Sequence, residues 1–313
     1  MKRLLVIGTT LILYAATAAQ GTPLKEINIS YVKSPFNLQV MVMKNQRLLE
    51  KEFAGDGITI NWHEITSGAK QAQAMAAGSL DIGSVMNTTS VLLANAAGNP
   101  IRIINGVSRP SKTFAIVARK NGPTTVEELK GASIAGPKGT VLHQLLVAAL
   151  DSKGMTIDDV NFISMKLPQA RTAMLAGKID AALLAASLVI KSVDAGAHVI
   201  TTADGLVTPK LVSAASGAFA AEHPDVIKRY RKVFMATMQF IDTHWDEALA
   251  IGINEHGISK KDGQTLADWA GFTDHLLPAD LDSMREDVKF LKANNMLKND
   301  VNPEEICLPG AVK

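Results

Sequence analysis

Residues 74–81 read AMAAGSLD and residues 173–180 read AMLAGKID, so the pattern A-M-x-A-G-x-[L/I]-D occurs twice, 99 residues apart. In each copy a helical stretch stops at a glycine, the residue that most often follows the last turn of a helix. An aspartate then opens an apolar, strand-like run. We interpret the two copies as equivalent units of two similar lobes, with chance similarity between two helix ends as the alternative.

Apolar, β-prone runs alternate with helical stretches on both sides of this repeat. Strands are expected at 27–32, 58–64, 82–85, 101–107, 114–118, 133–135, 160–164, 181–184 and 199–202. Helices are expected at 39–52, 69–77, 90–97, 126–129, 141–152, 169–176 and 188–194. This alternation indicates α/β units with parallel sheets. Beyond residue 221 only helices are expected, at 225–243, 245–255, 260–269 and 278–293.

The N-terminus has the pattern of an export signal. Lys2 and Arg3 precede an apolar stretch at 4–16, which is shorter than the about 20 residues of a membrane span. Small residues at 16–18 then suit a signal peptidase. We therefore expect residues 1–18 to be a signal peptide and the mature protein to be periplasmic, with an anchor helix as the alternative.

Charge and cysteine content narrow the class of protein. Removal of residues 1–18 takes away Lys2 and Arg3 and leaves 30 basic against 30 acidic residues. A neutral chain without a basic tail argues against nucleic acid as a partner. Cys307 is the one cysteine, so no internal disulfide can form, and the sequence assigns no role to its thiol.

The glycine-rich segment GPKGT at 136–140 does not fit a nucleotide-binding loop. A P-loop needs lysine directly after its last glycine, whereas here Pro137 follows Gly136 and lysine precedes the glycine of Lys138-Gly139-Thr140. The motifs G-x-S-x-G and H-E-x-x-H are absent, and no nucleophile accompanies His143 in sequence. The sequence therefore contains no motif that indicates an enzyme, and we expect no metal and no cofactor.

Four predicted helix starts carry residues suited to an anion, at 64–68, 86–90, 138–140 and 167–169. A helix start leaves N–H groups unpaired and carries partial positive charge. Ligands of α/β sheets lie beyond the carboxyl ends of the strands. Ordinary N-capping explains any single start, but several starts converging from two lobes would bind a small anion without a metal. We interpret GPKGT as part of such a site.

The order and spacing of several segments resemble those of the periplasmic substrate-binding proteins of ABC importers for aliphatic sulfonates, taurine and nitrate. Together these segments cover most of the chain from about residue 26 to about residue 243. They are INISYVKSPFNLQVMVMKNQRLLEKEF, ITSGAKQAQAMAAGSLDIG, AAGNPIRIINGV, TVEELKGASIAGPKGTVLHQLLVAAL, VNFISMKLPQARTAMLAGKIDAAL and AEHPDVIKRY.

The resemblance implies an α/β fold of the type II periplasmic binding protein class, with two α/β lobes, a two-strand hinge, a ligand cleft between the lobes and a helical C-terminal segment. Residues 19–109 and 205–313 would form lobe 1, and residues 110–204 lobe 2. The implied function is that of a monomeric solute-binding component, which closes on a small organic anion of the sulfonate type and delivers it to an inner-membrane ABC permease.

The resemblance also implies a set of ligand-binding residues in the loops that follow the strands. They are Ser34, Pro35, Phe36, Asn37, Ser67, Gly68, Met86, Asn87, Thr88, Lys138, Gly139, Thr140, Pro168 and Gln169. Arg109 lies at the first lobe crossing, where it would either pair with an anionic head group or be a solvated hinge residue. Phe36, Met86 and Leu142 either line an apolar end of the pocket or belong to the core.

One segment departs from the family pattern. Where many members carry a Trp-Asp-Pro-like stretch, this chain has Ala185-Ala186-Ser187. The pocket beside Ala186 would therefore be roomier and less polar, and the missing carboxylate disfavours an amine such as taurine. Nitrate, an apolar carboxylate or a thiamine-pyrimidine-type heterocycle remain alternative ligands. A same-fold enzyme and a sensor adaptor are the alternatives of another class.

Overall fold

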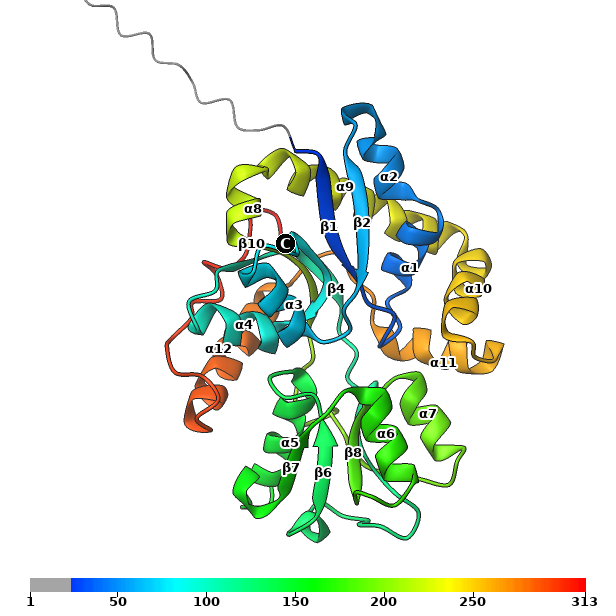
Figure 1. The fold of residues 1–313 in the computed structure, drawn as a ribbon, viewed down its shortest axis with the longest axis vertical. Helices are drawn as coiled ribbons and strands as arrows, with labels where there is room; N and C mark the ends of the chain where they lie inside the picture. Colours follow the sequence, from blue (N-terminus) through cyan, green and yellow to red (C-terminus); the bar gives the residue numbers. More distant parts are fainter. Residues whose placement is uncertain (1–23) are drawn as a thin grey trace, which may run out of the picture.

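The computed structural model describes residues 24–313, so the expected signal peptide lies outside the described residues. Ten strands form two five-stranded sheets, one above the other in Figure 1. The first sheet contains β1 (Glu26–Tyr31), β2 (Thr59–Glu64), β3 (Ile82–Asn87), β4 (Ile101–Ser108) and β10 (Leu211–Ser216). The second contains β5 (Phe114–Ala118), β6 (Ser133–Gly136), β7 (Asn161–Ser164), β8 (Ala181–Ala185) and β9 (His198–Thr202). Their orders, β2-β1-β3-β10-β4 and β7-β6-β8-β5-β9, correspond position by position.

Both sheets are mixed, which corrects the prediction of parallel sheets. β10 runs antiparallel to β3 and β4, and β5 runs antiparallel to β8 and β9, while the pairs of β1 and of β6 are parallel. The chain crosses from one sheet to the other after β4 and again after β9. Because each crossing leaves from the carboxyl end of a strand, the next strand starts at the facing end of the other sheet and runs away from it.

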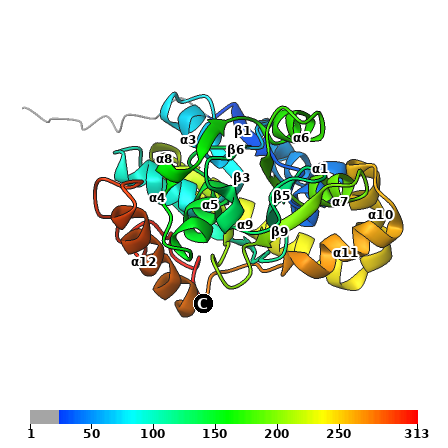
Figure 2. The ribbon, with the colours of Figure 1, turned by 90° about the horizontal axis from the view of Figure 1, so that it is seen from below.

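The described chain has twelve α-helices. They are α1 (Leu38–Asn45), α2 (Leu48–Phe53), α3 (Gly68–Ala76), α4 (Thr88–Ala96), α5 (Val141–Asp151), α6 (Leu167–Leu175), α7 (Ser187–Val193), α8 (Gly217–Glu222), α9 (Pro224–Thr243), α10 (Trp245–His256), α11 (Lys260–Ala270) and α12 (Pro278–Ala293). Seen from below, α11 and α12 lie on opposite flanks of the second sheet (Figure 2). Within residues 24–313, no helix is both long and apolar enough to cross a membrane.

The two copies of the repeat occupy equivalent places. One copy joins α3 to β3 and the other joins α6 to β8, which hold the same position in the two sheet orders. Gly78 and Gly177, which end the helices, have φ values of 69° and 68°. This left-handed conformation is costly for a residue with a Cβ atom, which explains the glycine in both copies.

The two aspartates of the repeat make the same contact. The carboxylate of Asp81 accepts the backbone N–H of Asn28 in β1 at 2.7 Å. The carboxylate of Asp180 accepts that of Ser133, in the corresponding strand β6, at 3.0 Å. The interpretation of the repeat as equivalent units of two lobes is therefore confirmed.

Three local features differ from the expected elements. The helix expected at 39–52 is broken at Arg47, whose φ of 55° separates α1 from α2. The segment 126–129 forms only a 3-10 turn at Glu127–Leu129. Strand β10 and the short helix α8 were not expected, because LVSAAS at 211–216 is rich in small residues and lacks a clear apolar alternation. Its pairing with β3 and β4 on both sides makes it a strand.

Candidate functional site

A cavity of about 750 Å³ lies between the two sheets. Glu64 and Asn87, at the carboxyl ends of β2 and β3, line it from the first sheet. Ser164 and Ala185, at the ends of β7 and β8, line it from the second. The cavity thus occupies the place where α/β sheets bind their ligands.

Many of the predicted site residues meet at this cavity. Its lining includes Ser34, Pro35, Ser67, Gly68, Asn87, Lys138, Gly139, Thr140 and Gln169. Leu142, for which a pocket or a core position was expected, lines it as well. Among the described residues, the other predicted members fall outside this lining: Phe36, Asn37, Met86, Thr88, Arg109, Pro168 and Ala186.

Four helices start at the cavity, and one of them, α4 in the first sheet's lobe, is capped there by the side chain of Asn87. The other three are α3 from the first sheet and α5 and α6 from the second, and their N-cap residues Ser67, Thr140 and Lys166 all line the cavity. Within the described chain, none of the three forms a side-chain capping hydrogen bond, and the Thr140 hydroxyl instead donates to the Pro137 carbonyl at 2.9 Å. The backbone N–H groups of these first turns are therefore available to an anion in the cavity.

Asn87 adds a side-chain donor beside the start of α3. Its Oδ1 accepts the backbone N–H of Ser90 at 2.8 Å and so caps α4, and the residue is only 9% exposed. A Cβ atom on Gly68 would lie 3.0 Å from Nδ2 of Asn87 and 2.8 Å from Oγ of Ser90. Gly68 therefore allows the Asn87 amide to approach the helix start closely. Within the described chain, the Asn87 Nδ2 group donates no hydrogen bond.

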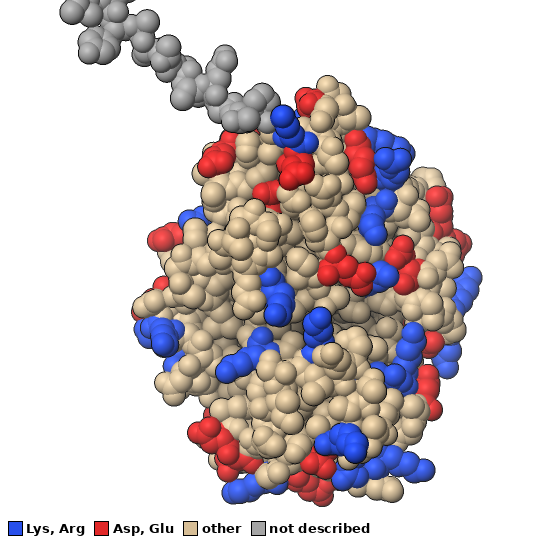
Figure 3. Space-filling view, in the orientation of Figure 1, with Lys and Arg blue, Asp and Glu red and all other residues tan. Residues whose placement is uncertain are grey.

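The charge of the lining is mainly positive. Lys70, Lys138 and Lys166 line the cavity, against the single carboxylate of Glu64 among the described lining residues. Figure 3 shows Lys and Arg side chains gathered across the middle of this face, with carboxylates beside them. Lys70 and Lys166 were not among the expected site residues. Their signal was present in the sequence, since both flank helix starts that follow strands.

His143 supports the GPKGT loop. Burial lowers the pKa of His143 to about 4, and the nearby charge of Lys138 acts in the same direction. The neutral ring stacks on Phe162 with centroids 4.9 Å apart, and its Nδ1 accepts the Gly139 N–H at 3.4 Å. Its place is therefore behind the loop, where it holds Gly139.

Several predicted residues lie behind the cavity wall. Phe36 is 2% exposed and packs on the His256 ring at a centroid distance of 5.3 Å. The Asn37 amide donates to the Val32 carbonyl at 2.8 Å, which fixes the loop after β1. Met86 belongs to the apolar core because alternate residues of β3 face opposite sides of the sheet.

Two further predicted residues contribute backbone contacts. The Thr88 N–H donates to the Lys210 carbonyl at 3.0 Å, and the Ala186 N–H donates to the Thr113 carbonyl at 2.9 Å. Both side chains are almost fully buried. Pro168 is exposed on the outer side of α6, in a shallow depression next to Gln169.

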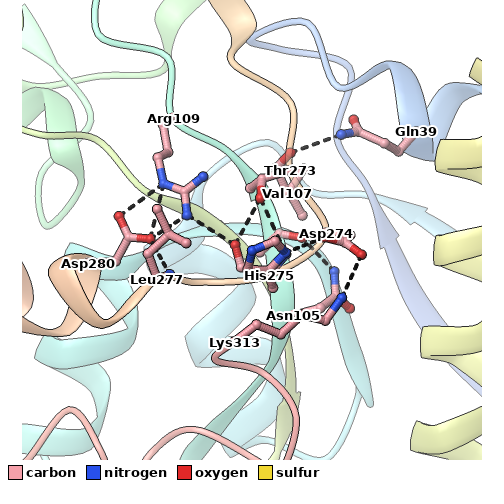
Figure 4. A network of polar contacts seen from close by, with 11 residues as sticks. Gln39, Asn105, Val107, Arg109, Thr273, Asp274, His275, Leu277, Asp280 and Lys313 are labelled. Atoms are coloured by element: carbon pink, nitrogen blue, oxygen red, sulfur yellow. Dashed lines mark hydrogen bonds and ion pairs between the residues drawn. The ribbon is translucent and has the colours of Figure 1, made fainter. Parts of the chain in front are cut away.

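Arg109 makes a structural ion pair. Its guanidinium binds the carboxylate of Asp280 through two nitrogens and donates to the His275 carbonyl at 3.1 Å (Figure 4). Burial would raise the pKa of Asp280, but the hydrogen bonds from Arg109 and from the Leu277 N–H lower it overall. Arg109 therefore neither lines the cavity nor is a solvated hinge residue, because its ion pair ties the first crossing to α12.

A polar network joins the two sheets beside the cavity. The Ser90 hydroxyl of α4 donates to the Gly139 carbonyl at 2.7 Å. Gln144 of α5 accepts the Thr89 hydroxyl and donates to Asp287 of α12 at 2.7 Å. Asp287 also pairs at 3.1 Å with Lys210, which lies at the second crossing and is buried. No local sequence pattern indicates this network, because its members are far apart along the chain.

The chain matches the NMT1/THI5-like family over residues 53–248. It is 30% identical over 269 residues to a Bacillus subtilis (strain 168) protein named for binding aliphatic sulfonates, with 83% of this chain and 80% of that protein covered. It is 28% identical over 180 residues to the taurine-binding periplasmic protein of Escherichia coli (strain K12), covering 56% and 55%.

The fold has solved counterparts. The alkanesulfonate-binding protein of Xanthomonas axonopodis pv. citri, solved with MOPS bound, is similar with a TM-score of 0.79 at 20% identity, covering 92% of this chain and 99% of that chain. The predicted periplasmic binding protein fold, with its helical C-terminal segment, is thus confirmed. The resemblance inferred from the order of the segments is confirmed as well. The chain belongs to the NMT1/THI5-like family.

Proposed function

We propose that this chain is the periplasmic solute-binding component of an ABC importer and that it binds a small organic anion of the sulfonate type. The observation that carries the proposal is the convergence, on one cavity, of three helix starts from both sheets that have no side-chain cap within the described chain. Helix starts bind anionic groups through their N–H groups and their dipole. The names of the relatives, for sulfonates and for taurine, support the same class of ligand.

The lobes of this receptor are 19–109 with 205–313 and 110–204, joined by the two crossings. Sheet membership supports these boundaries, since β1–β4 and β10 fall in lobe 1 and β5–β9 in lobe 2. An anion held by helix starts of both lobes would stabilise the closed state, because only that state offers all of the contacts.

The cavity suits an organic anion better than nitrate. A volume of about 750 Å³ is in the range of pockets that hold organic molecules. Val85, Phe114 and Leu142 line it and would cover an alkyl or aryl body. Three ammonium groups against one carboxylate in the described lining disfavour a ligand with an amine. We further propose a monomer that delivers its ligand to a permease and catalyses no reaction, as the relatives named for binding support.

Thermal unfolding of the mature chain, from Ala19, against a panel of anions tests this function. The panel holds alkyl and aryl sulfonates, taurine, nitrate, carboxylates and a thiamine pyrimidine. A sulfonate at 100 times its Kd should add about 2.7 kcal/mol to the free energy of unfolding and raise Tm by several degrees. A panel in which no sulfonate raises Tm would contradict the proposal.

An Asn87→Asp variant tests whether the Tm shift comes from sulfonate binding in the cavity. Aspartate keeps the oxygen that caps α4 but replaces the cavity-side donor by a negative charge. We expect this change to abolish the Tm shift produced by the sulfonate. Asn121→Asp is the matched control, because Asn121 is exposed and lies outside the described lining.

A further inference from the structure

Three lysines surround the mouth of the cavity. Lys70 is in the first turn of α3, beside the first sheet. Lys138 is in the loop before α5 and Lys166 is the N-cap of α6, both beside the second sheet. All three line the cavity and are exposed. Among residues 24–313, none of them has an ion-pair partner within 4.0 Å.

The donors at the buried end are much less exposed than these lysines. Asn87 is 9% exposed and Thr140 5%, and both line the cavity, Asn87 with its side-chain amide and Thr140 with its backbone N–H, since the Thr140 hydroxyl donates to the Pro137 carbonyl. The apolar side chains of Val85, Phe114 and Leu142, all at most 5% exposed, line the same buried part. The cavity therefore has a buried level of neutral donors and apolar surface, and an exposed level of ammonium groups.

The two levels differ in what they can bind. Neutral N–H donors in a buried site hold one anionic head group whose body packs on the apolar wall. The exposed lysines carry three positive charges, and Glu64 offsets one of them. A single head group at the buried level leaves this excess charge uncompensated, whereas a second acidic group at the mouth would compensate it.

We infer that the ligand is an organic dianion, with a sulfonate at the buried donors and a second acidic group, such as a carboxylate, at Lys70, Lys138 and Lys166. This inference rests on the proposed function and specifies the ligand class of the same site. The lysines come from both lobes, so the second group adds to the contacts that exist only when the lobes are closed. Long lysine stems let the ammonium groups follow ligands of different length.

Matched pairs of ligands test the inference by calorimetric titration of the whole mature chain. Propanesulfonate is compared with 3-sulfopropionate, and benzenesulfonate with 4-sulfobenzoate, so that each pair differs by one carboxylate. We expect the dianion of a pair to bind about tenfold more tightly at low salt, as two uncompensated charges near a third in a water-like medium imply. In 1 M salt, where the screening length is about 3 Å, the preference should fall to about twofold.

Variants then locate the second group. Changing Lys70, Lys138 and Lys166 together to glutamine should remove the tenfold preference, because the dianion then loses more affinity than the monoanion. Lys298→Gln, an exposed lysine outside the described lining, is the control and should keep the preference. A Tm of the unliganded triple variant close to that of the wild type shows that the variant is folded.

The outcomes distinguish a failure of the dianion inference from a failure of the proposed function. Equal affinity of a monoanion and its dianion overturns the dianion inference and leaves the sulfonate receptor standing. A preference that survives the triple variant also overturns it, because the second group then binds elsewhere. If neither member of any pair binds, the proposed function fails, and the inference fails with it.

Discussion

Replacing Asp287 by alanine removes the carboxylate that connects the two sheets to the second crossing. Asp287 accepts the Gln144 amide of α5 at 2.7 Å and pairs with Lys210 at 3.1 Å. The side chain of Lys210 is 0% exposed and that of Asp287 is 12% exposed. The substitution therefore leaves a buried ammonium group without its counter-charge.

The expected cost follows from that burial. Removal of one partner of a buried ion pair costs about 3–5 kcal/mol of the free energy of unfolding. Lys210 keeps hydrogen bonds to the Thr208 carbonyl at 2.8 Å and to the Ser283 hydroxyl at 2.9 Å. We therefore expect the lower end of this range, about 3 kcal/mol. Urea unfolding followed by circular dichroism measures it.

Asp282→Ala is the matched control on the same helix. Asp282 is 69% exposed and pairs with Arg285 at i,i+3, so its removal should cost at most about 1 kcal/mol. The double change Lys210→Met with Asp287→Leu should recover most of the loss, because it removes the buried charge. Equal, small losses for the two alanine variants, or no recovery in the double variant, would refute the account of this network.

Three further predictions concern the loop, its histidine and the hinge. Gly139→Ala should cost about 1–2 kcal/mol in urea unfolding, because φ is +70° and the nearest atom to a new Cβ lies at an uncrowded 3.7 Å; an unchanged stability would contradict this. The pKa of His143, about 4 against an ordinary 6.5, means that its contribution is complete above pH 6.5 and is lost as the pH falls toward 4. Between pH 6.5 and 4 the free energy of unfolding of the wild type should therefore fall by up to about 3 kcal/mol more than that of His143→Asn. Parallel pH profiles of the two proteins would contradict this role of His143. Because the pKa of Asp280 is lowered, its contribution is present above about pH 4 and is lost at lower pH; Arg109→Met should lower stability at pH 7 and flatten this acid-side decline.

The α/β organisation could be predicted because it depends on local patterns. The repeated A-M-x-A-G-x-[L/I]-D combines a buried methionine, a glycine in the left-handed conformation and an aspartate that binds the neighbouring strand. Each of these features acts within one helix–strand unit. Helix starts after strands were predictable for the same reason, and Ser67, Asn87 and Thr140 do meet at one cavity.

Long-range contacts set the limit of that prediction. Strand β10 exists because β3 and β4 pair with it on both sides, and its own six residues carry little strand signal. Arg109 binds Asp280, which is 171 positions away, and no local pattern reveals that partner. Phe36 and Asn37 follow Ser34 and Pro35 in sequence, but the turn of the loop directs them into the core rather than toward the cavity.

A crystal structure with the tightest-binding sulfonate of the panel tests the central claim most directly. The account predicts sulfonate oxygens within hydrogen-bond distance of the Asn87 amide and of backbone N–H groups at the starts of both α3 and α5. The anomalous signal of the sulfonate sulfur identifies the head group independently of its body. A sulfonate that contacts only one lobe, or that lies outside the cavity between the sheets, would contradict the account.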